Sequence, residues 1–221
     1  MTSENTSAET LSAQQQAIVP IAAFAAAGDM PKLSAALTQG LDAGLAISDA
    51  KEVLVQLYAY AGFPRSLNAL TELMKVLEER RKRGIQDSPG CEPSHAIPKG
   101  DALRVAGTDN QTKLVGKPVQ GPLFDFAPAI GEYLQTHLFG DIFERDNLDW
   151  KKRELATVGM LSALPGAEAQ LQSHMGISMN VGITVSQLRH LTQLLADRVG
   201  PENARRGREA LERQLAAQPG K

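Results

Sequence analysis

The stretch GAEAQLQSHMGISMNVGITVSQL (166–188) has the pattern of two helices that follow each other directly. Its first part spaces apolar and small residues as a helix does, and predicts a helix over 167–181 with His174 near the buried stripe. Thr184, with Gln187 three residues later, has the form of a capping box and predicts the start of the next helix. The stretch therefore indicates an all-α arrangement with a histidine directed inward.

The same helical pattern extends over most of the chain, with little sign of strands. Gly62 and Gly200 suit helix ends, Pro64 and Pro201 suit the first turn of the helices that follow, and Ser48 is expected to cap a helix. Helices are expected at 11–27, 31–43, 48–61, 64–83, 122–138, 149–163, 167–181, 184–199 and 201–217.

Two parts of the sequence repeat each other. DAGLAISDA (42–50) matches NVGITVSQL (180–188) at a spacing of 138 residues, and LSAQQQAIVPIAA (11–23) runs parallel to LDWKKRELATVGM (148–160) at a spacing of 137. A four-helix unit used twice implies two pseudo-symmetric units related by a two-fold axis, each covering the apolar face of the other.

The repeat and the composition divide the chain into four segments. We expect a flexible N-terminus at 1–10, a first helical unit at 11–84, a connector at 85–120 and a second helical unit at 121–218. The connector is rich in Gly, Pro, Ser and Asp and has no sustained period, so we expect order there only where it lies against the helices.

The bulk composition is that of an ordinary soluble globular protein. Of the 221 residues, 43% are hydrophobic and 22% are charged, and the formal net charge is −2. This balance gives no reason to expect nucleic acid or an anionic membrane as a partner. Cys91 is the only cysteine, which excludes an intrachain disulfide and favours a cytoplasmic location.

One apolar run resembles a secretory signal. AIVPIAAFAAAG (17–28) ends in small residues, but residues 1–16 contain Glu4 and Glu9 and no Lys or Arg, so the positive region of a signal is missing. The run is also too short to span a bilayer. It is expected to form a buried helix of the mature protein.

The two repeats differ at two ionisable positions. His174 aligns with Ala36 and Glu154 aligns with Ala17, so the second repeat has both groups and the first has neither. A Glu and a His on neighbouring helices would form a coupled pair in which the carboxylate orients the imidazole. The alternatives are a histidine that is merely hydrogen-bonded in the core and an acidic residue that favours a helix N-terminus.

The first repeat has its own polar cluster, around a Gly-Phe-Pro turn. QLYAYAGFPRSLNAL (56–70) contains Tyr58, Tyr60 and Arg65, whereas LLADRVGPENARR (194–206) keeps the turn without tyrosines. The tyrosines are either substrate-binding residues or packing residues of a helix corner.

As a set, these segments resemble the carboxymuconolactone decarboxylase family, which shares its fold with the alkyl hydroperoxidase D-like proteins. The resemblance rests on HLFGDIFERDNLDWKKREL (137–155), on the spacing from His174 to Gly182 followed by ITVSQL, and on YAYAGFPRSLNAL (58–70). It covers most of both predicted units, and it implies the tandem form of the family fold.

The peroxidase branch of this fold carries Cys-x-x-Cys-x-x-x-His on its catalytic helix. With His174 as that histidine, the cysteine positions are occupied by Ala167 and Gln170, and Cys91 lies in the connector. A dithiol peroxidase needs an attacking and a resolving thiol, so this activity is disfavoured. The decarboxylase-like branch remains, and the resemblance then implies that Glu154 and His174 are the acid–base residues.

The favoured hypothesis is a cofactor-free decarboxylase or isomerase acting on a small carboxylated lactone or enol-forming acid. His174 would protonate the carbanion that decarboxylation leaves. Arg65 would hold the substrate carboxylate, and Tyr58 and Tyr60 would contact the substrate. Because the polar groups of the two repeats complement each other, we expect Tyr58 or Tyr60, with Arg65, within roughly 10 Å of one cavity that contains His174.

Two other classes of function stay open. The chain could be a non-catalytic oligomeric helical protein that binds a ligand or serves as a scaffold, because fold resemblance does not establish function. A metal site could involve His137 and His174, but no close His/Asp/Glu spacing supports it, so no metal is expected. Whichever function holds, we expect a homo-oligomer, a dimer or a trimer, because the family resemblance implies assembly.

Overall fold

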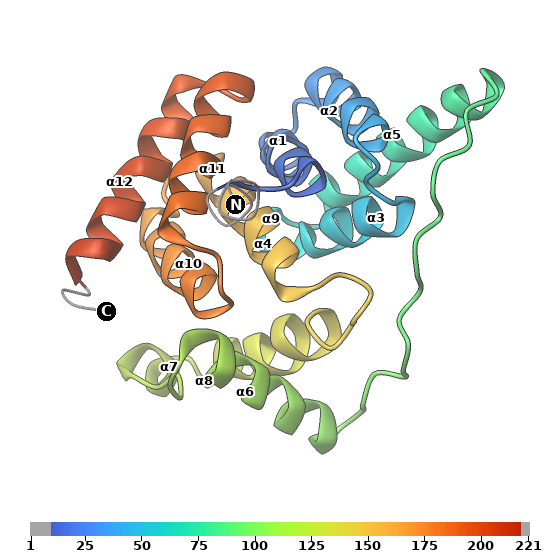
Figure 1. The fold of residues 1–221 in the computed structure, drawn as a ribbon. Coiled ribbons are helices and arrows are strands. Elements are labelled where there is room, and N and C mark those ends of the chain that lie inside the picture. The colour runs from blue at the N-terminus through green and yellow to red at the C-terminus, as the bar shows by residue number, and fades with distance from the viewer. Residues whose placement is uncertain (1–9, 218–221) are drawn as a thin grey trace, which may run out of the picture. The chain divides into compact units, whose positions relative to one another are not determined.

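The computed structural model describes residues 10–217, and its regular elements in that range are helices without any strand (Figure 1). The predicted all-α class is therefore confirmed. The elements are α1 (Ala13–Ala27), α2 (Met30–Asp42), α3 (Ile47–Gln56), α4 (Tyr58–Ala61), α5 (Phe63–Lys82), α6 (Asp101–Val115), α7 (Pro122–Phe126), α8 (Pro128–Tyr133), the π-helical segment η1 (Leu134–Ile142), α9 (Trp150–Ser162), α10 (Glu168–Asn180), α11 (Val185–Arg198) and α12 (Pro201–Ala217).

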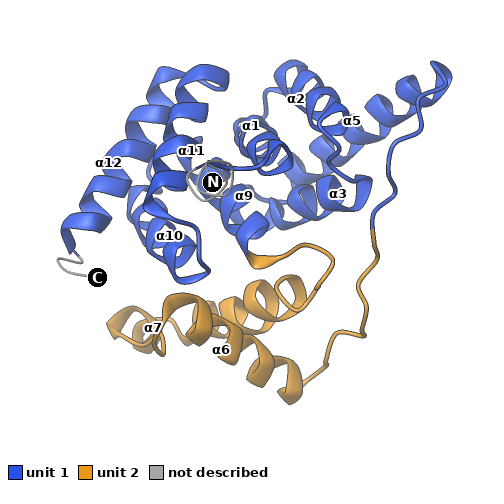
Figure 2. Ribbon diagram, viewed as in Figure 1, with its two compact units in different colours: residues 1–90, 151–221 blue, residues 91–150 orange. Residues whose placement is uncertain are grey.

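The chain forms two compact units, coloured separately in Figure 2. The large unit takes the residues up to Gly90 and those from Lys151 onward, and the small unit is Cys91–Trp150. The sequence-based boundaries divide the chain differently, since they assign 91–120 to a connector and 121–150 to the second helical unit. The predicted flexible segment 1–10 lies, except for Thr10, outside the described residues.

The predicted connector contains a full helix, α6, in the small unit. Asp101 lies in its first turn, and Gly116 ends it in the left-handed conformation, with φ 84°. Gly107 lets α6 approach η1 closely, because a Cβ at this position would lie 1.7 Å from the carbonyl oxygen of Gln135. Contact with η1, rather than apolar periodicity of its own, therefore orders this segment.

The predicted helix 122–138 is divided into α7, α8 and η1. Pro128 cannot donate a backbone hydrogen bond, and it disfavours the helical conformation of the residue before it. Ala127 accordingly has φ −132°. After α8 the chain widens into the π-helical turns of η1, which sequence periodicity does not reveal.

Capping follows the sequence at α11 and departs from it at α3. Thr184 and Gln187 form the predicted capping box. Ser48 does not cap α3: the N-cap is Ala46, and Ser48 is buried inside the helix. The backbone N–H groups of Ile47 and Ser48 instead donate to the carbonyls of Ser88 and Pro89 at 2.9 and 3.0 Å, so a distant part of the chain satisfies the helix start.

Two runs of four longer helices follow one another in the same order in the large unit. The first is α1, α2, α3 and α5, and the second is α9, α10, α11 and α12. Gly44 and Gly182, which the repeat aligns, both adopt the left-handed conformation between the second and third helix of their run, with φ 83° and 86°. This order agrees with a tandem repeat, whose two-fold symmetry stays a prediction.

The first helices of the two runs meet at small residues. A Cβ on Gly159 of α9 would lie 2.8 Å from the carbonyl oxygen of Val19 and 3.1 Å from the Cβ of Ala22, both on α1. Gly159 is also the residue that the spacing of 137 aligns with Ala22. The contact between α1 and α9 therefore depends on the absence of a side chain at Gly159.

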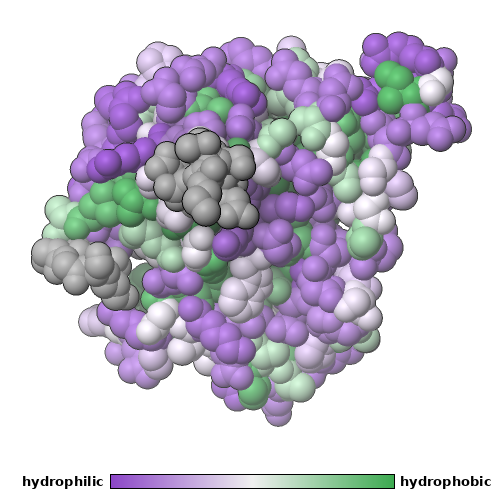
Figure 3. Space-filling view, in the orientation of Figure 1, coloured by the Kyte–Doolittle hydropathy of each residue, from purple (hydrophilic) through white to green (hydrophobic). Residues whose placement is uncertain are grey.

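The predicted buried helix at 17–28 is confirmed. Every residue of α1 from Ala17 to Ala26 is buried. Within residues 10–217, no helix is long and apolar enough to cross a membrane. The face of the molecule drawn in Figure 3 is largely hydrophilic, with smaller hydrophobic patches.

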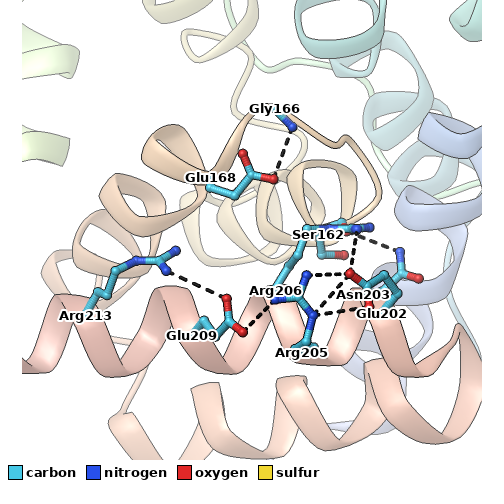
Figure 4. Close-up of polar contacts among 9 residues, drawn as sticks. All are labelled: Ser162, Gly166, Glu168, Glu202, Asn203, Arg205, Arg206, Glu209 and Arg213. Atoms are coloured by element: carbon cyan, nitrogen blue, oxygen red, sulfur yellow. Dashed lines mark hydrogen bonds and ion pairs between the residues drawn. The ribbon is translucent and has the colours of Figure 1, made fainter.

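The C-terminal end of α9 is fixed by α12 (Figure 4). Arg206 donates from Nε and Nη2 to the Ser162 carbonyl at 2.8 and 2.6 Å, and Asn203 donates to the same oxygen at 3.3 Å. Cationic donors at a helix C-terminus satisfy carbonyls that have no partner within the helix. These bonds hold one end of the helix that carries Glu154.

Candidate functional site

The structure brings Glu154 and His174 into direct contact. Glu154 lies on α9 and His174 on α10, and the Oε2 of Glu154 is 2.7 Å from the Nδ1 of His174. Glu154 is 0% exposed and His174 is 8% exposed. The coupling predicted from their shared absence in the first repeat therefore exists as a short buried contact.

Glu154 does not behave as an ordinary acidic residue at a helix N-terminus. Such residues stabilise the helix dipole from the solvent-exposed side of the first turn. Here every residue of α9 from Arg153 to Ser162 is buried, and the Glu154 carboxylate lies inside the protein. Burying a carboxylate costs free energy unless a partner compensates it, and His174 is that partner.

The contact leaves two atoms of the pair available for chemistry. With Nδ1–H donating to the carboxylate, the Nε2 of His174 is the nitrogen that can exchange a proton, and it makes no hydrogen bond to any described residue. Glu154 Oε1 is also buried without a hydrogen-bond partner among residues 10–217. Buried polar atoms without a hydrogen-bond partner are rare in proteins, and a catalytic role is one of the reasons for which they are retained.

Tyr60 of the short helix α4 lies beside the histidine. The two ring centroids are 5.9 Å apart and the ring planes meet edge to face, at 77°. The Tyr60 hydroxyl is 3.4 Å from the Oγ1 of Thr157. Burial, and then the negative charge of Glu154, hold the pKa of Tyr60 well above its usual range. Its hydroxyl therefore keeps its proton and can donate a hydrogen bond.

A buried polar network includes Thr157, the residue that contacts the Tyr60 hydroxyl. Arg153 is 0% exposed; it donates to Glu52 at 3.1 Å and to the side-chain oxygen of Gln56 at 3.2 Å. Gln56 donates in turn to the Oγ1 of Thr157 at 2.8 Å. The network joins α3 to α9 and fixes the threonine that contacts Tyr60.

This network was not foreseen from the sequence. Its members lie in two helices that the sequence predicts, but the sequence of a helix does not show which distant segment its buried polar residues will contact. The signal that the sequence does offer is the presence of several polar residues on the two predicted helices 48–61 and 149–163. The residues concerned are Glu52, Gln56, Arg153 and Thr157.

The other two predicted site residues have different neighbours. Tyr58 stacks on Phe63, with ring centroids 4.4 Å apart. The Arg65 guanidinium donates to the carbonyl of Ala26, at the C-terminal end of α1. Among the described residues, no hydrogen bond or ion pair joins Arg65 to Tyr60, Glu154 or His174. The substrate-binding roles of Tyr58 and Arg65 stay predictions.

The described residues contain no group of three or more His, Cys, Asp or Glu side chains that could hold a metal ion. His137 contacts Asp141 one turn further along η1, with 2.6 Å between Nδ1 and the carboxylate oxygen. His137 and Asp141 supply two side-chain ligands, whereas a structural zinc site has four.

Part of the chain matches a known protein family. Residues 128–213 match the model of the carboxymuconolactone decarboxylase family, so the matched segment includes both Glu154 and His174. The match does not extend to the first run of helices. Comparison with curated proteins gives no match.

Proposed function

We propose that the protein is a cofactor-free acid–base enzyme acting on a small carboxylated lactone, because residues 128–213 match the model of the carboxymuconolactone decarboxylase family. The observation that carries this proposal is the 2.7 Å contact between Glu154 and His174 in a buried site. A carboxylate that holds one imidazole nitrogen leaves the other positioned for proton transfer.

Decarboxylation needs one proton and a site for the electrons of the broken bond. When the carbon–carbon bond to the carboxylate breaks, CO₂ leaves and its electron pair enters the lactone as a dienolate. The protonated imidazole of His174 then gives its Nε2 proton to carbon, and the neutral ring regains a proton from water. Glu154 keeps the ring in one orientation and compensates its positive charge.

Tyr60 supplies the second polar group of the proposed reaction. Since its hydroxyl keeps its proton, it can donate a hydrogen bond to the oxygen on which the dienolate charge gathers. Thr157, held by Gln56, orients the hydroxyl. An isomerisation would use the same groups, with His174 removing a proton from one carbon and returning it to another.

A dithiol mechanism has no support in this chain. The positions on and before α10 that would carry the two thiols are Ala167 and Gln170, and Cys91 belongs to the small unit. The acid–base proposal uses only groups that the site contains.

The test is turnover of carboxymuconolactone by wild-type protein and by the variants Glu154→Gln and His174→Gln. Both variants keep the approximate size of the side chain. We expect each to lower kcat by about 10²-fold, the typical contribution of a positioned acid–base group. Glu212→Gln, which removes one exposed carboxylate of the same unit, should keep wild-type turnover. Far-ultraviolet circular dichroism checks that helix content is unchanged.

Wild-type turnover in both site variants would refute the assignment. If wild-type protein releases no CO₂ but binds the lactone in calorimetry, with binding weakened by His174→Gln, the chain is the non-catalytic ligand-binding protein considered above.

A further inference from the structure

A polar cavity lies in the large unit, and neither Glu154 nor His174 lines it. It is formed by α1, α2 and the C-terminal end of α11, and its volume is about 110 Å³. Figure 1 shows α11 beside α1, and the 3.2 Å hydrogen bond from Arg198 to Gln16 joins the two helices. The lining residues are Ala13, Gln16, Ala17, Pro20, Ala36, Gln39, Ala43 and Arg198.

The cavity occupies the position that the repeat assigns to the proposed acid–base site. Ala17 is the counterpart of Glu154 at a spacing of 137, and Ala36 is the counterpart of His174 at a spacing of 138. Both alanines line the cavity. Where the second run of helices places a carboxylate and an imidazole, the first run places two methyl groups. The space left by the shorter side chains explains why a cavity exists there.

The counterpart of Tyr60 at the same spacing is Arg198, which brings a positive charge to the cavity. Among the described residues, Arg198 makes one hydrogen bond, to the neutral side chain of Gln16, and no ion pair. By contrast, Arg205 on the next helix is paired with both Glu202 and Glu209. The guanidinium of Arg198 therefore keeps donors that no carboxylate of the described chain occupies.

Neutral polar groups complete the lining. The Gln39 side chain lies at the cavity and makes no hydrogen bond to any described residue. Pro20 has no N–H, so the carbonyl of Gln16 lacks its regular helical donor at a position that faces the same cavity. The cavity is thus lined by two amide side chains, a guanidinium and small apolar residues.

We propose that this cavity binds a small carboxylate, such as an acid of about two to four carbons. Guanidinium groups recognise carboxylates through paired hydrogen bonds, and the alanine walls accept a short carbon chain. The volume of about 110 Å³ corresponds to roughly four water molecules and fits an acid of this size. The lining has no carboxylate or histidine, so the site binds and does no acid–base chemistry. It stands independently of the proposed function.

Sodium acetate is the probe, titrated into ¹⁵N-labelled protein and followed by NMR at the Arg198 Nε–H and the side-chain amides of Gln16 and Gln39. Sodium chloride at equal ionic strength controls for screening, and acetamide controls for shape without charge. We expect saturable shifts with acetate alone and a Kd on the order of millimolar, which is typical of a single charged contact with a small ligand.

Two variants and one matched control decide the outcome. Arg198→Gln should raise the Kd at least tenfold, and Ala36→Val, which fills the cavity, should abolish the saturable shifts. Arg208→Gln removes an exposed positive charge from α12 and should leave the Kd unchanged. If Ala36→Val does not fold, Arg198→Gln alone decides.

Binding that survives Arg198→Gln, or shifts that do not saturate, would overturn the proposal. Acetate shifts centred on Tyr60 and His174 would place the ligand in the other site and would also overturn it.

Discussion

At the scale of single residues, Glu154 and His174 depend on each other for their burial. Removing one partner of a buried ion pair leaves the charge of the other partner buried without compensation. Removing both partners leaves no buried charge. The first run of helices shows the second situation, since it carries alanine at both aligned positions and still forms the same sequence of helices. The pair is therefore expected to serve chemistry rather than to be required for the fold.

This expectation can be measured as a coupling free energy. His174→Ala should lower the free energy of unfolding by about 3–5 kcal/mol, because the Glu154 carboxylate is left buried alone. The double variant Glu154→Ala/His174→Ala should lose less than the sum of the two single variants. Urea unfolding followed by circular dichroism gives the values. Strict additivity would show that the two residues do not stabilise each other.

Tyr60 should titrate abnormally. Its ionisation, isolated as the difference between the 295 nm absorbance of wild-type protein and that of Tyr60→Phe, should occur well above pH 10. Glu154→Gln should lower the Tyr60 pKa, because it removes a negative charge that disfavours the phenolate. Above about pH 10, the unfolded chain loses this proton before the folded chain does, so the stability advantage of wild-type protein over Tyr60→Phe should fall as the pH rises. An ordinary Tyr60 pKa in wild-type protein would contradict the buried position of the hydroxyl.

Glu154, His174 and Tyr60 could be singled out from the sequence because the two repeats differ there. The contact of Gln56 with Thr157 could not be foreseen, because it joins residues 101 positions apart and helical periodicity carries no information on such pairs. The neighbour of Arg65 could not be foreseen either: the sequence predicts that Arg65 holds a substrate carboxylate, whereas its guanidinium donates to a carbonyl at the end of α1.

At the scale of elements, the close approach of α9 to α1 determines where both helices lie. Alanine normally favours a helix over glycine by about 1 kcal/mol. At Gly159 this gain is opposed by a backbone carbonyl of α1 at 2.8 Å from the added Cβ. At Gly176 of α10 the added Cβ would meet only the far end of the flexible Gln214 side chain, at 2.7 Å.

The same substitution should therefore have opposite results at the two glycines. Gly159→Ala should lower the free energy of unfolding by about 1–3 kcal/mol, the usual cost of overpacking. Gly176→Ala should leave it unchanged or raise it by up to about 1 kcal/mol, because Gln214 can move. Thermal unfolding of both variants checks this, and equal effects would refute the close packing of α1 and α9.

Most helix boundaries could be predicted from the Gly, Pro and capping residues that begin or end helices, as the capping box at Thr184 shows. Two elements of the small unit could not. The helix α6 depends on its contact with η1 at Gly107. The segment η1 has π-type turns, which no residue pattern in the sequence predicts. In both cases the decisive interaction is tertiary, so local propensity was insufficient.

At the scale of the whole molecule, an exposed apolar stripe on α5 bears on assembly. Phe63, Leu67 and Met74 are 61%, 59% and 70% exposed and lie at helical spacing on one side of that helix. Exposed apolar patches of this kind commonly mark protein–protein contacts. We propose that the chain forms a homo-oligomer, a dimer or a trimer, through this stripe.

Size-exclusion chromatography with light scattering measures the oligomeric state directly. Wild-type protein should have two or three times the 23.7 kDa mass of one chain. Leu67→Glu should shift the population toward monomer, and Asn68→Glu, at an exposed position of the same helix on a different face, should do so less. A wild-type particle of one chain would contradict the proposal.

The buried ion pair of Glu52 with Arg153 also has a consequence for folding during translation. The two residues are 101 positions apart, so the first run of helices leaves the ribosome well before Arg153, which donates to the Glu52 carboxylate. Until α9 has emerged, Glu52 and Gln56 must remain in water, and α3 cannot close into its final core. The first run of helices is thus expected to stay partly open, and prone to aggregation, until α9 has left the ribosome.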